Sequence, residues 1–140
     1  MTDETALFAT NAWIRLFHEE VNKSEAYRRA TKTWEGDFYF IVEPDGFLTE
    51  PVYMYMDLWH GASRGAFIAQ DPSVKDPEFI ISAPVSTWQD VIELRLDPIK
   101  GLLTKQLKLK GNMAKIMRAV KAANELVRCT TRVPTSFSNQ

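Results

Sequence analysis

The chain has 140 residues, of which 45% are hydrophobic and 25% charged, with a formal net charge of −1. This balance indicates a single globular domain, and the near-zero charge excludes whole-molecule attraction to nucleic acid. The lone cysteine, Cys129, excludes an internal disulfide and favours a reducing compartment, so we expect a cytoplasmic protein. The acidic start is unlike a secretory signal, and no apolar run approaches the ~20 residues that span a bilayer.

The first thirty residues have a helical pattern. Apolar side chains recur at three- and four-residue spacing, which predicts one helix face made of Ala9, Trp13, Leu16, Phe17 and Val21. Thr2 or Asp3 could cap its start. Asn22 and Glu25 then resemble a capping box, which predicts a second and shorter helix.

The middle of the chain changes to a strand pattern. Residues 37–43 and 52–59 are rich in aromatic and β-branched side chains, and Pro44-Asp45-Gly46 gives a turn between them. Residues 66–70 and 78–82 predict two further strands. Because the connections are short, we expect an antiparallel meander.

Alternation along these strands defines two apolar faces. The face expected to point into the interior carries Phe38, Phe40, Met54, Met56 and Leu58. The opposite face carries Tyr39, Ile41, Tyr53, Tyr55 and Trp59. A free monomer would expose this second patch, so we expect a covering helix, a homodimer contact or a partner protein to bury it.

Helices return after Pro84. Ser86 predicts the cap of a helix with an apolar stripe made of Trp88, Val91, Ile92 and Leu96. Asp97-Pro98 predicts the start of the next helix, whose apolar residues are Ile99, Leu102 and Leu103.

The last part of the chain combines a strand, a turn and a helix. Residues 107–110 alternate leucine and lysine and predict a fifth short strand. Gly111-Asn112 predicts a turn and the cap of a final helix with the stripe Met113, Ile116, Met117, Val120 and Val127. Polar residues 135–140 predict a frayed tail, which leaves residues 1–134 as one α+β domain.

Charge is distributed unevenly along this organisation. Glu125 is the only acidic residue beyond position 100, whereas nine of the 17 basic residues lie from there onward: Lys100, Lys105, Lys108, Lys110, Lys115, Arg118, Lys121, Arg128 and Arg132. Such a block is typical of a solvated face that balances an acidic remainder. The alternative is peripheral contact with an anionic membrane, to which each basic residue near the surface contributes about 1 kcal/mol.

One match to a catalytic motif occurs at residues 61–65, which fit Gly-x-Ser-x-Gly. In a hydrolase, for example a thioesterase, this motif exposes the serine at a strand-to-helix turn, with an acidic residue and then a histidine later in the chain. No histidine follows His60, and residues 66–69 predict a strand. A hairpin loop explains the glycines, so we expect Ser63 not to be catalytic and the protein not to be an enzyme.

Metal and cofactor motifs are also missing from the sequence. His18, His60 and Cys129 are too few and too scattered for a zinc site. No glycine-rich phosphate or dinucleotide motif occurs. We therefore expect no catalytic residue, no metal and no cofactor.

Three segments together resemble the SCP-2 sterol-transfer (sterol carrier protein 2) family in its prokaryote-like stand-alone form: residues 34–46, 54–61 and 96–117. The specific part is the spacing from Asp97-Pro98 through Leu107-Lys108-Leu109 to Gly111-Asn112-Met113. The resemblance implies a five-stranded, mostly antiparallel sheet with helices on one face around a hydrophobic tunnel. Leu94 and Lys105 depart from the family pattern, which commonly has glycine at both positions.

The resemblance also implies non-catalytic binding or transfer of a lipid: a fatty acid, acyl-CoA, sterol or isoprenoid-like molecule. Carried over by position, the cavity wall consists of Phe38, Phe40, Met54, Met56, Trp88, Val91, Ile92, Leu102, Leu103, Met113, Ile116, Met117 and Val120. Its methionines are adaptable gap-fillers, which suits a surface that accepts varied shapes. The alternative is an interaction module whose own side chains fill the tunnel and whose aromatic outer sheet face docks a protein partner.

Overall fold

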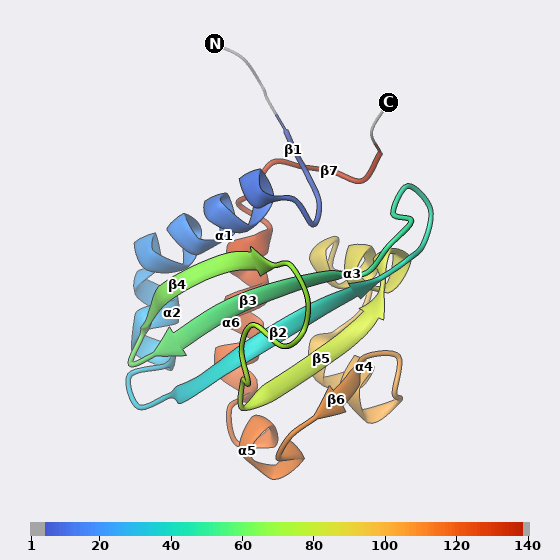
Figure 1. The fold of residues 1–140 in the computed structure, drawn as a ribbon. Helices are drawn as coiled ribbons and strands as arrows, with labels where there is room; N and C mark the ends of the chain where they lie inside the picture. Colours follow the sequence, from blue (N-terminus) through green and yellow to red (C-terminus); the bar gives the residue numbers. More distant parts are fainter. Residues whose placement is uncertain (1–4, 139–140) are drawn as a thin grey trace.

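The computed structural model describes residues 5–138 (Figure 1). Its strands are β1 (Ala6–Leu7), β2 (Glu35–Glu43), β3 (Val52–Trp59), β4 (Ala62–Ala69), β5 (Phe79–Pro84), β6 (Lys108–Lys110) and β7 (Thr135–Ser136). Its helices are α1 (Asn11–Lys23), α2 (Glu25–Ala30), α3 (Val85–Ile92), α4 (Pro98–Leu103), α5 (Met113–Met117) and α6 (Val120–Thr130).

The main sheet has five strands in the order β4-β3-β2-β5-β6. Strands β2, β3 and β4 form the expected antiparallel meander. The fourth expected strand, β5, instead pairs parallel with β2, so the prediction of a simple meander is wrong at this step. The nine residues 70–78 make this crossover possible, because an extended chain of that length reaches about 30 Å. The α+β class and the mostly antiparallel five-stranded sheet are confirmed.

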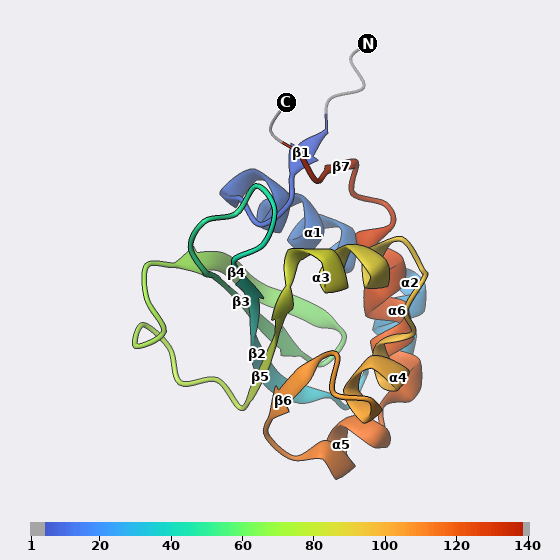
Figure 2. The same cartoon turned by 90° about the vertical axis from the view of Figure 1, so that its right-hand side faces the viewer.

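The helices lie on one face of this sheet, as Figure 2 shows with the sheet edge-on. The inner face contributes large side chains to the core, and Phe38 pairs with Met56 and Phe40 with Met54 across the β2–β3 ladder. The rings of Phe38 and Phe40 stack at 5.1 Å between centroids. The alternation read from the sequence therefore assigns the two faces correctly.

The outer face is covered by the connection 70–78 and not by a helix (Figure 2). The backbone N–H of Lys75 donates to the Tyr39 hydroxyl at 2.9 Å, and its ammonium lies 5.1 Å from the centre of the Tyr55 ring. Tyr39 is fully buried and Tyr55 nearly so. Trp59 remains exposed at the strand end, with the Arg64 guanidinium 4.3 Å from its ring centre.

Helix starts differ from the predictions in three places. Thr10 caps α1, and the predicted caps Thr2 and Asp3 lie outside the described residues. Ser24 caps α2 in place of Asn22, because its hydroxyl accepts from the Tyr27 N–H at 3.0 Å. Helix α3 begins at Val85, one residue before the predicted cap Ser86. By contrast, Asp97 and Asn112 are confirmed as the caps of α4 and α5.

Two further differences concern the last forty residues. The predicted final helix is broken between Met117 and Val120, so that its apolar stripe changes direction at the break. The tail is not frayed at its start, because Thr135 and Ser136 pair parallel with Ala6 and Leu7. The indole N–H of Trp13 holds this strand by donating to the Thr135 hydroxyl at 2.9 Å.

Leu94 and Lys105 have a common backbone explanation. Each follows the C-cap of a helix and has a positive φ, 63° for Leu94 and 64° for Lys105. A left-handed residue just after a helix is most often glycine, since a Cβ there costs on the order of 1 kcal/mol. Both side chains are exposed. The departure from glycine therefore concerns how α3 and α4 end, and not the interior.

Gly111 offers a sharp stability test of the turn before α5. Its φ is +138°, and a Cβ there would lie 2.7 Å from a Phe79 ring carbon and 3.0 Å from the Glu78 carbonyl oxygen. We expect Gly111→Ala to lower the free energy of unfolding by about 2 kcal/mol, measured by urea denaturation. Gly65→Ala is the matched control, because a Cβ there meets nothing within 4 Å. Equal effects of the two substitutions would contradict the packing described for Gly111.

Candidate functional site

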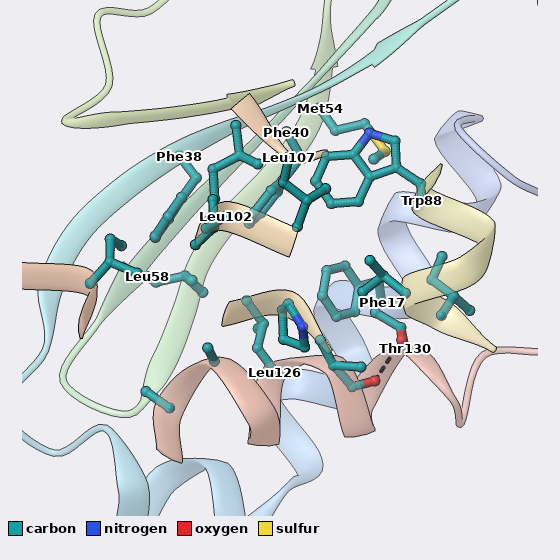
Figure 3. Close-up of a pocket in the computed structure, with 18 of the residues that line it drawn as sticks. Phe17, Phe38, Phe40, Met54, Leu58, Trp88, Leu102, Leu107, Leu126 and Thr130 are labelled. Atoms are coloured by element: carbon teal, nitrogen blue, oxygen red, sulfur yellow. Dashed lines mark hydrogen bonds between the residues drawn. The ribbon is translucent and has the colours of Figure 1, made fainter. Parts of the chain in front are cut away.

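An apolar cavity of about 120 Å³ lies between the inner face of the sheet and the helices (Figure 3). The sheet supplies Phe38, Phe40 and Leu58, and Leu126 and Thr130 of α6 face them from below. The full lining comprises Phe8, Trp13, Phe17, Tyr27, Trp34, Phe38, Phe40, Met54, Leu58, Ile81, Trp88, Val91, Ile92, Pro98, Leu102, Leu107, Ile116, Ala119, Ala122, Ala123, Leu126, Val127 and Thr130.

The cavity arises from a mismatch of side-chain size. Protein interiors are normally close-packed, with few voids larger than a water molecule. Helix α6 and its N-cap turn the small residues Ala119, Ala122 and Ala123 toward the lining, whereas the sheet presents phenylalanine rings. Leu126 and Val127 on the same helix are only half-buried although both belong to the apolar interior. The interior is therefore incompletely filled along α6.

The indole nitrogens of the three tryptophans in the lining all have partners within the protein. The indole N–H of Trp34 donates to the Gly36 carbonyl at 3.0 Å, and that of Trp88 donates to the Ile41 carbonyl at 3.0 Å. Trp13 donates to Thr135, away from the cavity. These rings therefore present only carbon to the cavity, which favours a hydrocarbon over a polar molecule.

The two lining residues with hydroxyl groups do not change this character. The Thr130 hydroxyl donates to the Val127 carbonyl at 2.5 Å, within its own helix. Burial raises the pKa of Tyr27 far above its ordinary value, so the phenol stays neutral. No charged residue appears in the lining. The arrangement can hold an apolar chain, and it offers no nucleophile, base or metal ligand to it.

Eight of the thirteen residues predicted for the cavity wall do line the cavity: Phe38, Phe40, Met54, Trp88, Val91, Ile92, Leu102 and Ile116. Five lie elsewhere. Met56 is fully buried in the core, and Met113 and Met117 pack half-buried against it. Leu103 is 60% exposed at the end of the short helix α4, and Val120 is 38% exposed because the helix breaks just before it.

The sequence analysis missed a second group of lining residues. The N-terminal helices and the segment before them supply Phe8, Trp13, Phe17 and Tyr27. The apolar face containing Trp13 and Phe17 was visible as helical periodicity, but periodicity does not say which cavity a face meets. The alanines of α6 carried no signal at all, because alanine is also common on ordinary helix surfaces.

Ser63 of the Gly-x-Ser-x-Gly motif lies inside strand β4 and not at a strand-to-helix turn. His18 and Asn22 of α1 reach it from the helix layer. The His18 Nδ1 lies 2.7 Å from the Ser63 hydroxyl oxygen, and the Asn22 side chain bonds both the N–H and the carbonyl of Ser63, at 2.8 and 3.0 Å. The sequence did not anticipate this cluster, since His18 precedes the serine.

Residues 5–138 contain neither a metal centre nor a membrane-spanning helix. No group of three or more histidine, cysteine, aspartate or glutamate side chains in this range is placed to hold a metal ion. No helix in the same range is both long and apolar enough to cross a bilayer.

Comparison with known structures gives close matches. A crystal structure of sterol carrier protein 2 is 40% identical with a TM-score of 0.82, and the match covers 90% of this chain and 98% of that one. A solution structure of a conserved hypothetical protein from Thermus thermophilus, described as possibly a sterol carrier protein, is 36% identical with a TM-score of 0.84. That match covers 98% of this chain and 97% of the other. Sterol carrier protein 2 of Yarrowia lipolytica in its apo form shares the fold at 15% identity and a TM-score of 0.57, and the match covers 94% of this chain and 99% of that one.

No curated protein matches this chain. A family model, however, matches residues 14–124, which is most of the sequence and extends the resemblance to include α1. With the cavity, the fold and these matches together, the chain belongs to the SCP-2 sterol transfer family.

Proposed function

We propose that the protein binds a lipid in the cavity between the sheet and α6, and carries it without chemically changing it. The observation that supports this most is the lining itself: a space bounded by apolar side chains, with the three indole N–H groups and the Thr130 hydroxyl already hydrogen-bonded. Each buried methylene of such a ligand would contribute about 0.8 kcal/mol. Family membership supports the same function.

Among lipids, the cavity dimensions favour a single flexible acyl chain over a rigid sterol. The volume of about 120 Å³ is similar to that of an engineered apolar cavity of roughly 150 Å³ that admits benzene. A longer ligand must therefore widen the cavity as it enters. An acyl chain can enter one methylene at a time along the half-buried face of α6, whereas a fused ring system needs its full width at once.

The alternative function, a module that docks a protein through the outer sheet face, has less support. Tyr39 and Tyr55 on that face are buried by the protein's own connection 70–78. The cavity is also not filled by its own side chains, as the module hypothesis requires. A homodimer through this face stays a prediction.

A hydrolase centred on Ser63 is disfavoured by the hydrogen bonds around His18. The Asn22 amide nitrogen lies 3.4 Å from His18 Nε2, and the Ser63 hydroxyl lies 3.4 Å from the Gly65 carbonyl oxygen. This arrangement fits a His18 tautomer whose Nδ1–H donates to Ser63. A general base would need the opposite arrangement, with an unprotonated nitrogen facing the serine. Ser63 is also only 4% exposed. We therefore propose that this cluster joins α1 to β4 and is not an active site.

Peripheral contact with an anionic membrane is part of the proposal. Lys108, Lys115 and Arg128 are ion-paired with glutamates, but Lys100, Lys105 and Lys110 are exposed and form no ion pair with any residue the structure describes. Leu103, 60% exposed, lies among them in sequence. This end of the molecule, with α4, β6 and α5, lies opposite the end with β1 and β7 (Figure 1). A cytoplasmic location is proposed with it, on the support of the free and buried Cys129.

A cavity-filling substitution tests lipid binding. Ala123 lines the cavity from α6, so Ala123→Phe places a ring in the space that the chain would occupy. We expect it to weaken binding of a fluorescent fatty acid at least tenfold, which is about 1.4 kcal/mol. Native mass spectrometry of the freshly purified protein should also lose any lipid that co-purifies with the wild type.

Ala12→Phe is the control for this experiment, because it makes the same substitution at an exposed position of α1. It should bind like the wild type. If the wild type neither co-purifies with lipid nor binds fatty acid, the proposed function is wrong.

The Ser63 cluster predicts a stability effect and no catalytic one. Ser63→Ala removes the hydroxyl that pairs with His18, and we expect unfolding to become easier by about 1 kcal/mol in urea. His18→Ala should lower the free energy of unfolding by a similar amount. Hydrolysis of a p-nitrophenyl acyl ester should stay at the buffer rate for all three proteins. Turnover by the wild type that disappears in Ser63→Ala would instead establish a hydrolase.

Membrane contact is tested with a triple variant, Lys100→Gln, Lys105→Gln and Lys110→Gln. Since each lysine contributes about 1 kcal/mol, the affinity for phosphatidylserine-containing vesicles, measured by co-sedimentation, should fall roughly a hundredfold. The control removes the same charge elsewhere, with Arg15→Gln, Arg29→Gln and Lys32→Gln at exposed positions. Equal losses in the two triple variants would mean that only net charge matters and would refute a specific docking surface.

A further inference from the structure

The apolar cavity adjoins a second, polar cleft at the surface. This cleft has a volume of about 370 Å³ and is lined by Ala30, Thr31, Thr33, Trp34, Glu35, Lys115, Arg118, Ala119 and Ala122. Three of these residues, Trp34, Ala119 and Ala122, also line the apolar cavity. The wall that the two spaces share therefore consists of one indole ring and two alanine methyl groups. Alanine has the smallest side chain of any residue with a Cβ.

The position of this wall coincides with the break between α5 and α6. Ala119 is the N-cap of α6, with φ −120° and ψ 36°, and makes no side-chain capping bond. Arg118 immediately before it is the C-cap of α5. The helix break places two residues outside regular helix beside the shared wall, so the cleft and the cavity adjoin at the turn between α5 and α6.

The charged side chains around the cleft contact partners within the protein, with one exception. The Lys115 ammonium lies 2.8 Å from the Glu78 carboxylate, donates to the Glu35 carbonyl at 2.6 Å and sits 5.0 Å from the Trp34 ring centre. The Glu35 carboxylate pairs with His60 at 2.5 Å. Arg118 is exposed and has no ion pair among the residues that the structure describes. Arg118 is therefore the cationic side chain of this cleft that is free to meet an anion from outside the protein.

We propose that Arg118 binds the anionic head group of an amphiphile whose apolar chain occupies the cavity, with Trp34 as the boundary between head and tail. The ligand class is a single acyl or alkyl chain ending in a carboxylate or a phosphate. A guanidinium binds either group through two parallel hydrogen bonds, whereas a neutral alcohol gains little from it. The inference rests on the proposed lipid binding and adds to it the orientation of the ligand and the residue that recognises its charge.

The experiment compares three amphiphiles of one chain length by isothermal titration calorimetry: dodecanoate, dodecyl phosphate and dodecanol. We expect Arg118→Gln to lower the affinity for dodecanoate and for dodecyl phosphate about tenfold and to leave the affinity for dodecanol unchanged. The head group whose affinity falls more in this variant, carboxylate or phosphate, is the one that Arg118 recognises better. Arg118→Glu should lower the affinity for both anions further than Arg118→Gln does, and should bind dodecylammonium better than the wild type does.

Arg128→Gln is the matched control. It removes the same charge from an exposed position ten residues along, about 15 Å up the helix, where Arg128 pairs with Glu125. Far-UV circular dichroism and the melting temperature establish that the variants fold.

The head-group site is refuted if Arg118→Gln leaves the affinity for all three ligands unchanged, or lowers the affinity for the anions and the alcohol equally. It is also refuted if Arg128→Gln lowers the affinity for the anions as much as Arg118→Gln does. In those cases the lipid cavity itself stands. If the wild type binds none of the three amphiphiles, the head-group site and the proposed function are both wrong.

Discussion

The inner face of the sheet presents large side chains, and the helix that crosses it presents small ones. Strands β2 and β3 must bury Phe38, Phe40 and Met54 away from water, and α6 is the long element that runs behind them (Figure 1). Because Ala119, Ala122 and Ala123 project little from the helix, the two layers meet without filling the space between them. Apolar burial thus holds the layers together while leaving a void between them.

Support comes from elements at the edges of the helix layer. The network of His18, Asn22 and Ser63 joins α1 to β4, and the cap at Asp97 fixes the start of α4 through two N–H donors. Strand β7 closes the top of the helix layer by pairing with β1. None of these contacts involves α6 directly. The helix is therefore held mainly through its half-buried apolar face and the buried residues Cys129 and Thr130 at its end.

Much of this arrangement could be predicted from the sequence, because it depends on local signals. The turn at Gly111-Asn112 and the cap at Asp97 have side chains that specify one backbone geometry, and alternation in residues 37–43 separates the inner face from the outer one. The parallel pairing of β5 with β2 could not be read in the same way. It depends on where a nine-residue connection crosses the sheet, and that path is set by tertiary contacts such as the one from Lys75 to Tyr39.

The candidate site was predictable to a similar extent. Large residues on strong periodic faces, such as Phe40 and Trp88, were placed correctly along the cavity. Leu103 and Val120 were misplaced because both stand at helix ends, where a break of one or two residues rotates a side chain from the interior to solvent. The alanines that create the void were invisible because a cavity is made by the absence of side-chain atoms, and a periodicity of apolar residues records only their presence.

The four tryptophans are distributed so that the molecule contains its own optical reporter. Trp13, Trp34 and Trp88 line the cavity, and only Trp59 lies outside it, on the exposed strand end. An apolar chain entering the cavity would alter the surroundings of three indoles and leave the fourth as an internal reference. Filling of the void and movement of its wall can therefore be followed in the unlabelled protein, in real time, from the wavelength and intensity of its ultraviolet emission.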